Sequence, residues 1–243
     1  MSDEILFYDL PSRGKCQCWS PNTWKTRAVL NYKNLPYKTE FVPFTQLQGK
    51  LKATGMSPNE PGVAWCDYSV PAIRLPDGTH LMDSLKIARK LDELHPTPSL
   101  HLDTDVFEKT SAVTAKLGGP LLPVFMPIIG REIVLEEDAE WFETDRSQKF
   151  GMSMAEFERT KGGELAWEKT GEGMEMLRGL LRENPEGPFI LGQEASYGDL
   201  MLLGLFEFYR KLGIWGKFRE VYGGREVDEL WEAGRKWVER DDH

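Results

Sequence analysis

The segment Ser69–His95, SVPAIRLPDGTHLMDSLKIARKLDELH, decides the fold of this chain. A Pro-Asp-Gly turn separates two apolar runs, so residues 71–75 and 79–82 are predicted to pair as an antiparallel hairpin. A helix is predicted to begin at Asp83-Ser84, because the apolar residues after it recur every three or four positions. These are Ile87, Ala88, Leu91 and Leu94. The segment therefore predicts a ββα unit.

Upstream of this unit the sequence predicts a strand, a helix and a second strand. Residues 5–10 form a continuous apolar run, typical of a central strand that is buried on both faces. Ser20-Pro21 is a typical N-cap and first residue of a helix. Residues 37–42 alternate between the two faces of a strand. For residues 44–69 we expect a loop with at most one short helix, so the first domain has the order βαβ-ββα.

An all-helical second domain is predicted beyond residue 95. The run His95-Pro96-Thr97-Pro98-Ser99 cannot continue a helix, because its prolines lack backbone donors and restrict the residues before them. Residues 1–95 are therefore expected to form an α/β domain and residues 100–243 an all-α domain. Within the second domain we expect a helix break at Gly118-Gly119-Pro120. Ser196 and Asp199 predict a capping box at the start of a buried central helix, a role in folding.

Composition excludes several classes of function. The 39 acidic and 30 basic side chains leave a net charge of −9, which disfavours nucleic-acid partners. No window approaches about 18 uninterrupted apolar residues, so no membrane span is predicted. The N-terminus lacks the pattern of a secretory leader, and three cysteines are too few for a disulfide framework. A folded, cytoplasmic protein with free thiols is expected.

The sequence also predicts no metal site and no nucleotide site. None of the four histidines lies at a ligand-like spacing from another histidine or a cysteine. Cys16-Gln17-Cys18 lacks the second pair of ligands that structural zinc requires. Phosphate-binding glycine motifs and the nucleophile elbow of hydrolases are also missing from the sequence.

Three loops of the first domain are expected to converge at one sheet edge. The bond before Pro71 is a candidate cis peptide, which would leave the backbone groups of Val70 free to pair with an extended peptide. Ser84, at a helix start, can hold a carboxylate, and Asp83 can take an ammonium. With Ser20 at another helix start, this set predicts a grip on a small zwitterionic peptide. Each residue also has a plain structural role open to it, as a cap or a strand-edge proline.

In these features the chain resembles the cytosolic glutathione transferases over nearly its whole length. The motifs that carry the resemblance are Ser20-Pro21, Val70-Pro71-Ala72-Ile73, Asp83-Ser84 with Ile87-Ala88, and Phe189-Ile190-Leu191-Gly192 through Ser196-Tyr197-Gly198-Asp199. The stretches around Phe7-Tyr8-Asp9-Leu10 and Trp19–Arg27 are similar to the fungal-specific class A enzymes, which are related to bacterial glutathione-dependent β-etherases. The resemblance implies a thioredoxin-like first domain and a helical second domain.

The resemblance also implies an activity. Ser20 would stabilise the thiolate of glutathione, while Val70, Pro71, Asp83 and Ser84 would hold the tripeptide. The thiolate would attack hydrophobic aromatic electrophiles, such as aryl ethers or other lignin-derived compounds, in detoxification. Glutathione would be a co-substrate, no metal would be needed, and the protein would be a homodimer.

Two other functions remain open on the same fold. The chain could be a ligandin that binds aromatic compounds with little turnover, or a glutathione-dependent thiol reductase that uses Cys18. Cys16 and Cys18 precede the position at which cysteine-type members carry their nucleophile. Lys50 and Lys52 are candidates for the glycine carboxylate of glutathione. Residues 123–128 could line the electrophile site or belong to the core.

Overall fold

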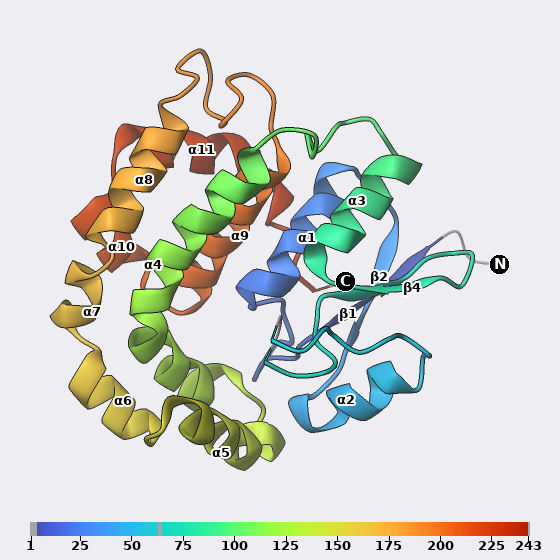
Figure 1. The fold of residues 1–243 in the computed structure, drawn as a ribbon, viewed down its shortest axis with the longest axis vertical. Helices are drawn as coiled ribbons and strands as arrows, with labels where there is room; N and C mark the ends of the chain where they lie inside the picture. The colour runs from blue at the N-terminus through green and yellow to red at the C-terminus, as the bar shows by residue number, and fades with distance from the viewer. Residues whose placement is uncertain (1–3, 63–64, 243) are drawn as a thin grey trace.

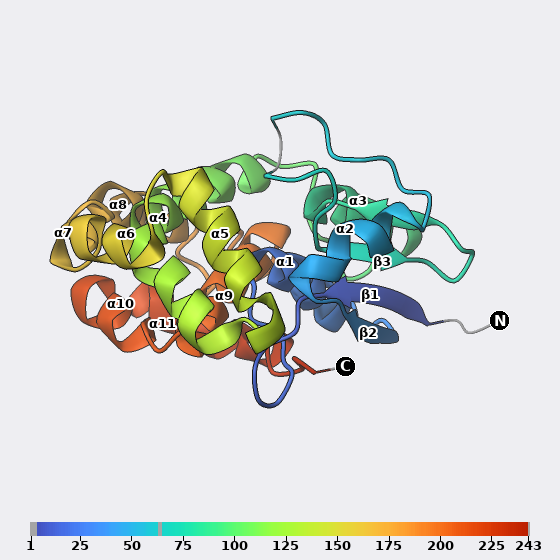
Figure 2. The same cartoon turned by 90° about the horizontal axis from the view of Figure 1, so that it is seen from below.

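The computed structural model describes residues 4–62 and 65–242. Residues 1–3, where the leader pattern was sought, and residues 63 and 64 of the predicted loop lie outside the described residues. Figures 1 and 2 show a sheet-containing domain beside a helical domain. Both parts of the predicted fold class are therefore present.

The first domain is built on a four-stranded sheet in the order β2-β1-β3-β4. Strand β1 (Ile5–Asp9) pairs in parallel with β2 (Tyr37–Phe41). The hairpin strands β3 (Ala72–Arg74) and β4 (His80–Met82) are antiparallel to each other, and β3 is antiparallel to β1. The predicted strands and hairpin are confirmed.

Helices cover both faces of this sheet. Helices α1 (Pro21–Tyr32) and α3 (Ser84–Leu94) lie on one face and α2 (Phe44–Lys52) on the other (Figure 1). The one short helix allowed between residues 44 and 69 is thus α2, which buries Leu47 and Leu51. Ser20 is the N-cap of α1 and Asp83 is the N-cap of α3, as predicted.

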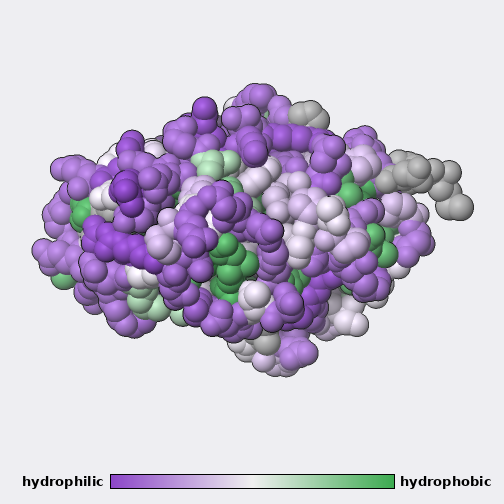
Figure 3. Space-filling view, turned by 90° about the horizontal axis from the view of Figure 1, so that it is seen from above, coloured by the Kyte–Doolittle hydropathy of each residue, from purple (hydrophilic) through white to green (hydrophobic). Residues whose placement is uncertain are grey.

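The second domain is helical, apart from isolated β-bridges near residues 189–194. Its α-helices are α4 (Val106–Ile128), α5 (Ala139–Phe150), α6 (Met154–Lys161), α7 (Glu164–Glu168), α8 (Gly171–Leu181), α9 (Tyr197–Lys211), α10 (Trp215–Tyr222) and α11 (Arg225–Gly234). Short helical turns η1 (Ile129–Ile133), η2 (Glu136–Asp138) and η3 (Arg235–Trp237) complete the domain. Hydrophilic residues dominate the face seen in Figure 3, and hydrophobic ones form only small patches there.

Helix α4 differs most from the prediction. The expected break at Gly118-Gly119-Pro120 is wrong, because the helix continues through it and through Pro123 and Pro127. Each proline removes one backbone donor. However, α4 packs against α8 and α9 along a buried face that includes Leu117 and Leu121, and this burial offsets the local loss.

The same segment bears on the membrane prediction. By length and composition alone, residues 106–133 could cross a membrane. The sequence predicted no membrane span because it contains no uninterrupted apolar run of the required length. In this segment, polar, glycine and proline residues interrupt the apolar ones. Here the segment forms α4 and η1, and α4 packs against α8 and α9.

Helix α9 is the centre of the molecule and joins the two domains. All its residues from Tyr197 to Tyr209 are buried, and the predicted capping box of Ser196 and Asp199 is confirmed. The helix packs directly against α1. At their crossing, a Cβ placed on Gly204 would lie 2.7 Å from the Cβ of Trp24. The absent side chain of Gly204 therefore sets how closely α1, which carries Ser20 at its start, approaches the helical domain.

Candidate functional site

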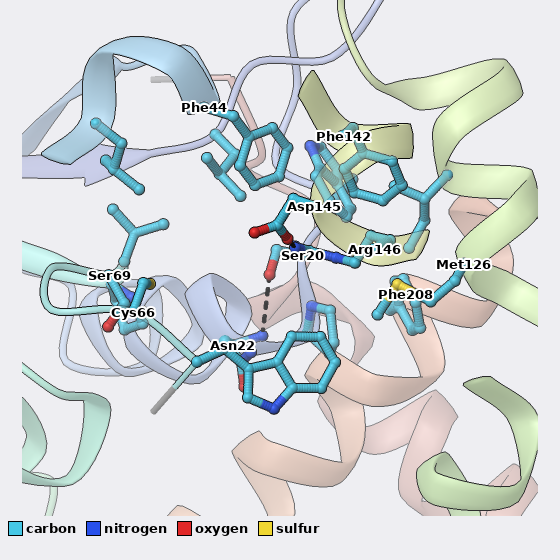
Figure 4. A pocket seen from close by; sticks show the side chains of 18 of the residues that line it. Ser20, Asn22, Phe44, Cys66, Ser69, Met126, Phe142, Asp145, Arg146 and Phe208 are labelled. Atoms are coloured by element: carbon cyan, nitrogen blue, oxygen red, sulfur yellow. Dashed lines mark hydrogen bonds and ion pairs between the residues drawn. The ribbon is translucent and has the colours of Figure 1, made fainter. Parts of the chain in front are cut away.

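A cavity of about 600 Å³ lies where the two domains meet. The five residues predicted to bind glutathione all line it: Ser20, Val70, Pro71, Asp83 and Ser84. Figure 4 shows Cys66 and Ser69 on one side of Ser20 and Met126 and Phe208 on the other. The loops that were expected to converge therefore do so, and their roles toward a ligand stay predictions.

Ser20 occupies the start of α1. Its Oγ accepts a hydrogen bond from the backbone N–H of Asn22 at 3.3 Å, as an N-cap does. A hydroxyl in this arrangement still has a hydrogen to donate. The first turn of α1 contains no acidic residue, so the positive end of the helix dipole is not neutralised from within the helix. The site is suited to an anion.

The Val70–Pro71 segment borders the same cavity. Their peptide bond is cis, which confirms that prediction. The C=O of Pro71 accepts from the N–H of Asp83 at 3.3 Å, which ties the segment to the start of α3. Among the described residues, the backbone N–H and C=O of Val70 have no hydrogen-bond partner. An extended peptide could pair with them.

Asp83 combines two roles at the start of α3. Its Oδ1 accepts from the N–H groups of Leu85 and Lys86, each at 3.0 Å. The hydrogen bonds described for this carboxylate use Oδ1, so Oδ2 remains suited to an ammonium group. Lys25 also lines the cavity, and burial lowers the pKa of its ammonium while the nearby Asp83 carboxylate opposes that shift.

Cys18 is badly placed for catalysis. Its side chain is fully buried, its Sγ lies 3.4 Å from Thr23 Oγ1, and burial raises the pKa of the thiol well above its usual value. Burial also raises the pKa of Cys16. Neither thiol lines the cavity, whereas the exposed Cys66 does. These facts oppose the reductase hypothesis that rests on Cys18, because thiol exchange requires an accessible thiolate.

The two lysines suggested for the glycine carboxylate do not line the cavity. Lys50 forms an ion pair with Glu40 instead. From the same helix, Gln48 does line it, and its side-chain amide bonds to both backbone groups of Tyr68. Sequence reasoning missed Gln48, since a lone glutamine on a short helix carries no signal.

Aromatic side chains form much of the remaining wall. Phe125 and Met126 lie in it, while Pro123 and Pro127 are buried in the core, so the segment 123–128 serves both predicted roles. Helix α5 adds Trp141, Phe142, Asp145, Arg146 and Lys149, none of which the sequence indicated. The cavity therefore combines polar groups around Ser20 with aromatic side chains that are suited to apolar ligands.

No group of three potential metal ligands occurs among the described residues.

Comparison with known proteins places this geometry in a family. Residues 19–94 match the glutathione S-transferase N-terminal domain, and residues 106–237 match the glutathione S-transferase C-terminal domain. The chain belongs to the glutathione S-transferase family. It is a glutathione transferase with a thioredoxin-like first domain and an all-helical second domain, as predicted, and glutathione is the co-substrate of this class of enzyme.

Its relatives include several fungal proteins. The glutathione S-transferase-like protein ustS of Aspergillus flavus is 28% identical over 96% of this chain and 89% of its own length. The structure of glutathione S-transferase CsGST63524 of Ceriporiopsis subvermispora, in complex with glutathione, matches with a TM-score of 0.84 at 27% identity, over 96% of this chain and 97% of that one. Glutathione transferase GSTFuA2 of Phanerochaete chrysosporium matches with a TM-score of 0.83 at 29% identity, over 97% and 98%.

Proposed function

We propose that this protein is a serine-type glutathione transferase in which Ser20 stabilises the thiolate of glutathione. The observation that carries the proposal is the position of Ser20 at the start of α1, in the wall of a cavity that has both polar and aromatic side chains. An enzyme of this class has to ionise a thiol whose ordinary pKa is about 8.5. A hydroxyl donor at the positive end of a helix supplies that stabilisation.

The tripeptide would lie along the edge formed by the Val70–Pro71 segment and the start of α3. The backbone groups of Val70 would pair with its extended backbone, next to Pro71. Asp83 would accept from its α-ammonium, and the N–H and hydroxyl of Ser84 would hold its carboxylate. This arrangement directs the cysteine sulfur toward Ser20.

The reaction is then a nucleophilic substitution or addition. The thiol proton leaves to solvent, and the sulfur accepts a hydrogen bond from the Ser20 hydroxyl. In a substitution, a carbon–sulfur bond forms at the electrophilic carbon while the bond to the leaving group breaks, and the leaving group departs with the electron pair. In an addition to an activated alkene, the same bond forms while the π electron pair moves to the neighbouring carbon, which then takes a proton from solvent. Phe44, Phe125 and Phe208 line the part of the cavity where the electrophile would lie.

The finer classification extends the same proposal. We infer a fungal class A enzyme related to the bacterial β-etherases, acting in detoxification on aromatic compounds such as aryl ethers from lignin. The similarity to two fungal glutathione transferases, CsGST63524 and GSTFuA2, supports a fungal type of enzyme, and the substrate class is our inference from the aromatic side chains of the cavity. We also expect a cytoplasmic homodimer.

A pair of serine variants tests the proposal. Ser20→Ala and Ser153→Ala each remove an N-cap, worth about 1 kcal/mol, but Ser153 caps α6 and does not line the cavity. We expect Ser20→Ala to lower kcat/KM for conjugation of 1-chloro-2,4-dinitrobenzene by about tenfold or more, and Ser153→Ala to leave it unchanged. Glutathione affinity, measured by calorimetry, should change little in both variants.

The same experiment distinguishes the transferase hypothesis from the ligandin hypothesis. The aromatic side chains of the cavity would suit storage of aromatic compounds as well as their conversion. A ligandin would bind aromatic ligands in both variants with little turnover in the wild type. Equal conjugation by wild type and Ser20→Ala would refute the serine mechanism.

A further inference from the structure

Helix α5 brings a cationic cluster to the wall of the cavity, among aromatic side chains. Arg146 and Lys149 lie one turn apart on α5, and both line the cavity together with Asp145. Asp145 pairs with Arg146 Nη1, and both its oxygens lie 2.9 Å from Lys149 Nζ. Two cations thus share one carboxylate, which leaves excess positive charge in the cavity of a strongly acidic protein.

The Arg146 guanidinium is enclosed by aromatic rings. Its Cζ lies 4.8 Å from the ring centroid of Phe142, 5.3 Å from that of Trp65 and 5.9 Å from that of Phe44. Only 12% of the side chain is exposed. Its Nε is buried and has no hydrogen-bond partner among the described residues. The hydrogen bond described for this guanidinium joins Nη1 to Asp145, so Nη2 remains able to donate to a ligand acceptor.

The surroundings narrow the chemistry of that ligand. Burial removes water from the guanidinium and lowers the pKa of Arg146, so an anion brought to it would interact in a medium less polar than water. The planar guanidinium fork matches a carboxylate, and Lys149 can add a second contact. Trp141 and Phe44 stack on each other in the same wall, with ring centroids 5.3 Å apart. The site therefore offers aromatic faces beside a carboxylate-binding group.

We propose that this cavity selects aromatic electrophiles that carry a carboxylate, with Arg146 as the main specificity-determining residue and Lys149 as its helper. The inference rests on the proposed transferase function and names the substrate class of the same site. The aromatic ring packs on the wall formed by α2 and α5, and its carboxylate meets Arg146. The reactive carbon of the ring faces the thiolate beside Ser20.

A matched pair of substrates tests the proposal. Glutathione displaces chloride from 4-chloro-3-nitrobenzoate and from its neutral carboxamide: a carbon–sulfur bond forms, the carbon–chlorine bond breaks, and chloride leaves with the electron pair. Each kcat/KM is divided by the uncatalysed rate constant, which removes the difference in intrinsic reactivity. We expect the wild type to favour the carboxylate, and Arg146→Met to lower this preference about tenfold, equal to about 1.4 kcal/mol.

Two further variants serve as controls. Arg159→Met removes the same charge from α6, outside the cavity, and should leave the preference unchanged. Lys149→Met changes a more exposed side chain and should lower the preference less than Arg146→Met does. If Arg146→Met does not fold, Lys149→Met still decides the question, because its preference must fall relative to Arg159→Met.

Binding without turnover keeps this test separate from the test of the proposed function. Tryptophan fluorescence quenching gives the affinity for 4-methyl-3-nitrobenzoate, which has no leaving group, and for its carboxamide. If conjugation fails but Arg146 still sets this preference, the transferase mechanism is wrong and the carboxylate site stands. An equal preference in wild type and Arg146→Met overturns the inference. The inference is also overturned if Arg146→Met raises the KM for glutathione but leaves the preference for the carboxylate unchanged. In that case the cations of α5 would bind glutathione and not the electrophile.

Discussion

The crossing of α1 and α9 can be tested with a single methyl group. Gly204→Ala would place a Cβ 2.7 Å from the Cβ of Trp24, whereas carbon atoms pack at roughly 3.5 to 4.0 Å. The two helices would have to separate by about 1 Å. Overpacking of this kind costs about 1 to 3 kcal/mol, while alanine in a helix interior gains about 0.5 to 1 kcal/mol over glycine. We therefore expect a net loss of up to about 2.5 kcal/mol.

Gly179→Ala is the matched control, because Gly179 lies in α8 and, among the described residues, no atom outside its own helix backbone and its chain neighbours lies within 4 Å of the added Cβ. This variant should gain stability by about 0.5 to 1 kcal/mol. Urea denaturation followed by tryptophan fluorescence compares the two. Since Ser20 lies one turn before Trp24, Gly204→Ala should also lower conjugation, by up to about a hundredfold for a displacement near 1 Å. A Gly204→Ala protein as stable and active as Gly179→Ala would refute the reasoning.

Three other substitutions probe buried polar groups. Arg27→Met leaves the Asp9 carboxylate, buried and 3.0 Å from the guanidinium, without that partner; it should cost about 3 to 5 kcal/mol, and adding Asp9→Asn should restore part of the loss in urea denaturation. Asp199→Ala removes the acceptor of three hydrogen bonds that hold the start of α9, so thermal unfolding should show a loss of about 2 to 4 kcal/mol. Burial raises the pKa of Glu207 from 4.5 to about 7. The folded protein favours the protonated Glu207 carboxyl, so this contribution to the free energy of unfolding is fully present below pH 4.5 and is lost as pH rises through about 7. Over that range the wild type should lose about 3 kcal/mol of stability relative to Glu207→Gln. The urea midpoints of the two proteins can be compared at a series of pH values. A difference between them that stays constant with pH would contradict this last expectation.

Local signals account for the parts of the fold that the sequence predicted well. The Pro-Asp-Gly turn, the N-caps at Ser20 and Asp83, and the apolar run of β1 each act within a few residues. Their strands and helices appear where expected, with ends that differ by one or two residues. Helix α4 was mispredicted because its continuation through three prolines depends on packing against α8 and α9, which no local pattern encodes.

The residues of the candidate site also fall into those that a local sequence signal predicted and those that it did not. Val70, Pro71, Asp83, Ser84 and Ser20 were found because X-Pro bonds and helix starts carry sequence signals, and they line one cavity. Gln48 and Arg146 were missed, since they reach the cavity only through the tertiary contact of α2 and α5. Cys18 seemed available in the sequence, but burial against Thr23 makes it inaccessible.

The central claim is that Ser20 stabilises the thiolate of bound glutathione. The ultraviolet absorbance of the thiolate, recorded against pH, measures this directly in wild type, Ser153→Ala and Ser20→Ala. We predict a thiolate pKa clearly below about 8.5 in the first two proteins, and a rise of about one unit or more in Ser20→Ala, since a hydrogen bond to a charged group is worth about 1.5 kcal/mol or more. An equally low thiolate pKa in Ser20→Ala, with glutathione still bound, would contradict the account.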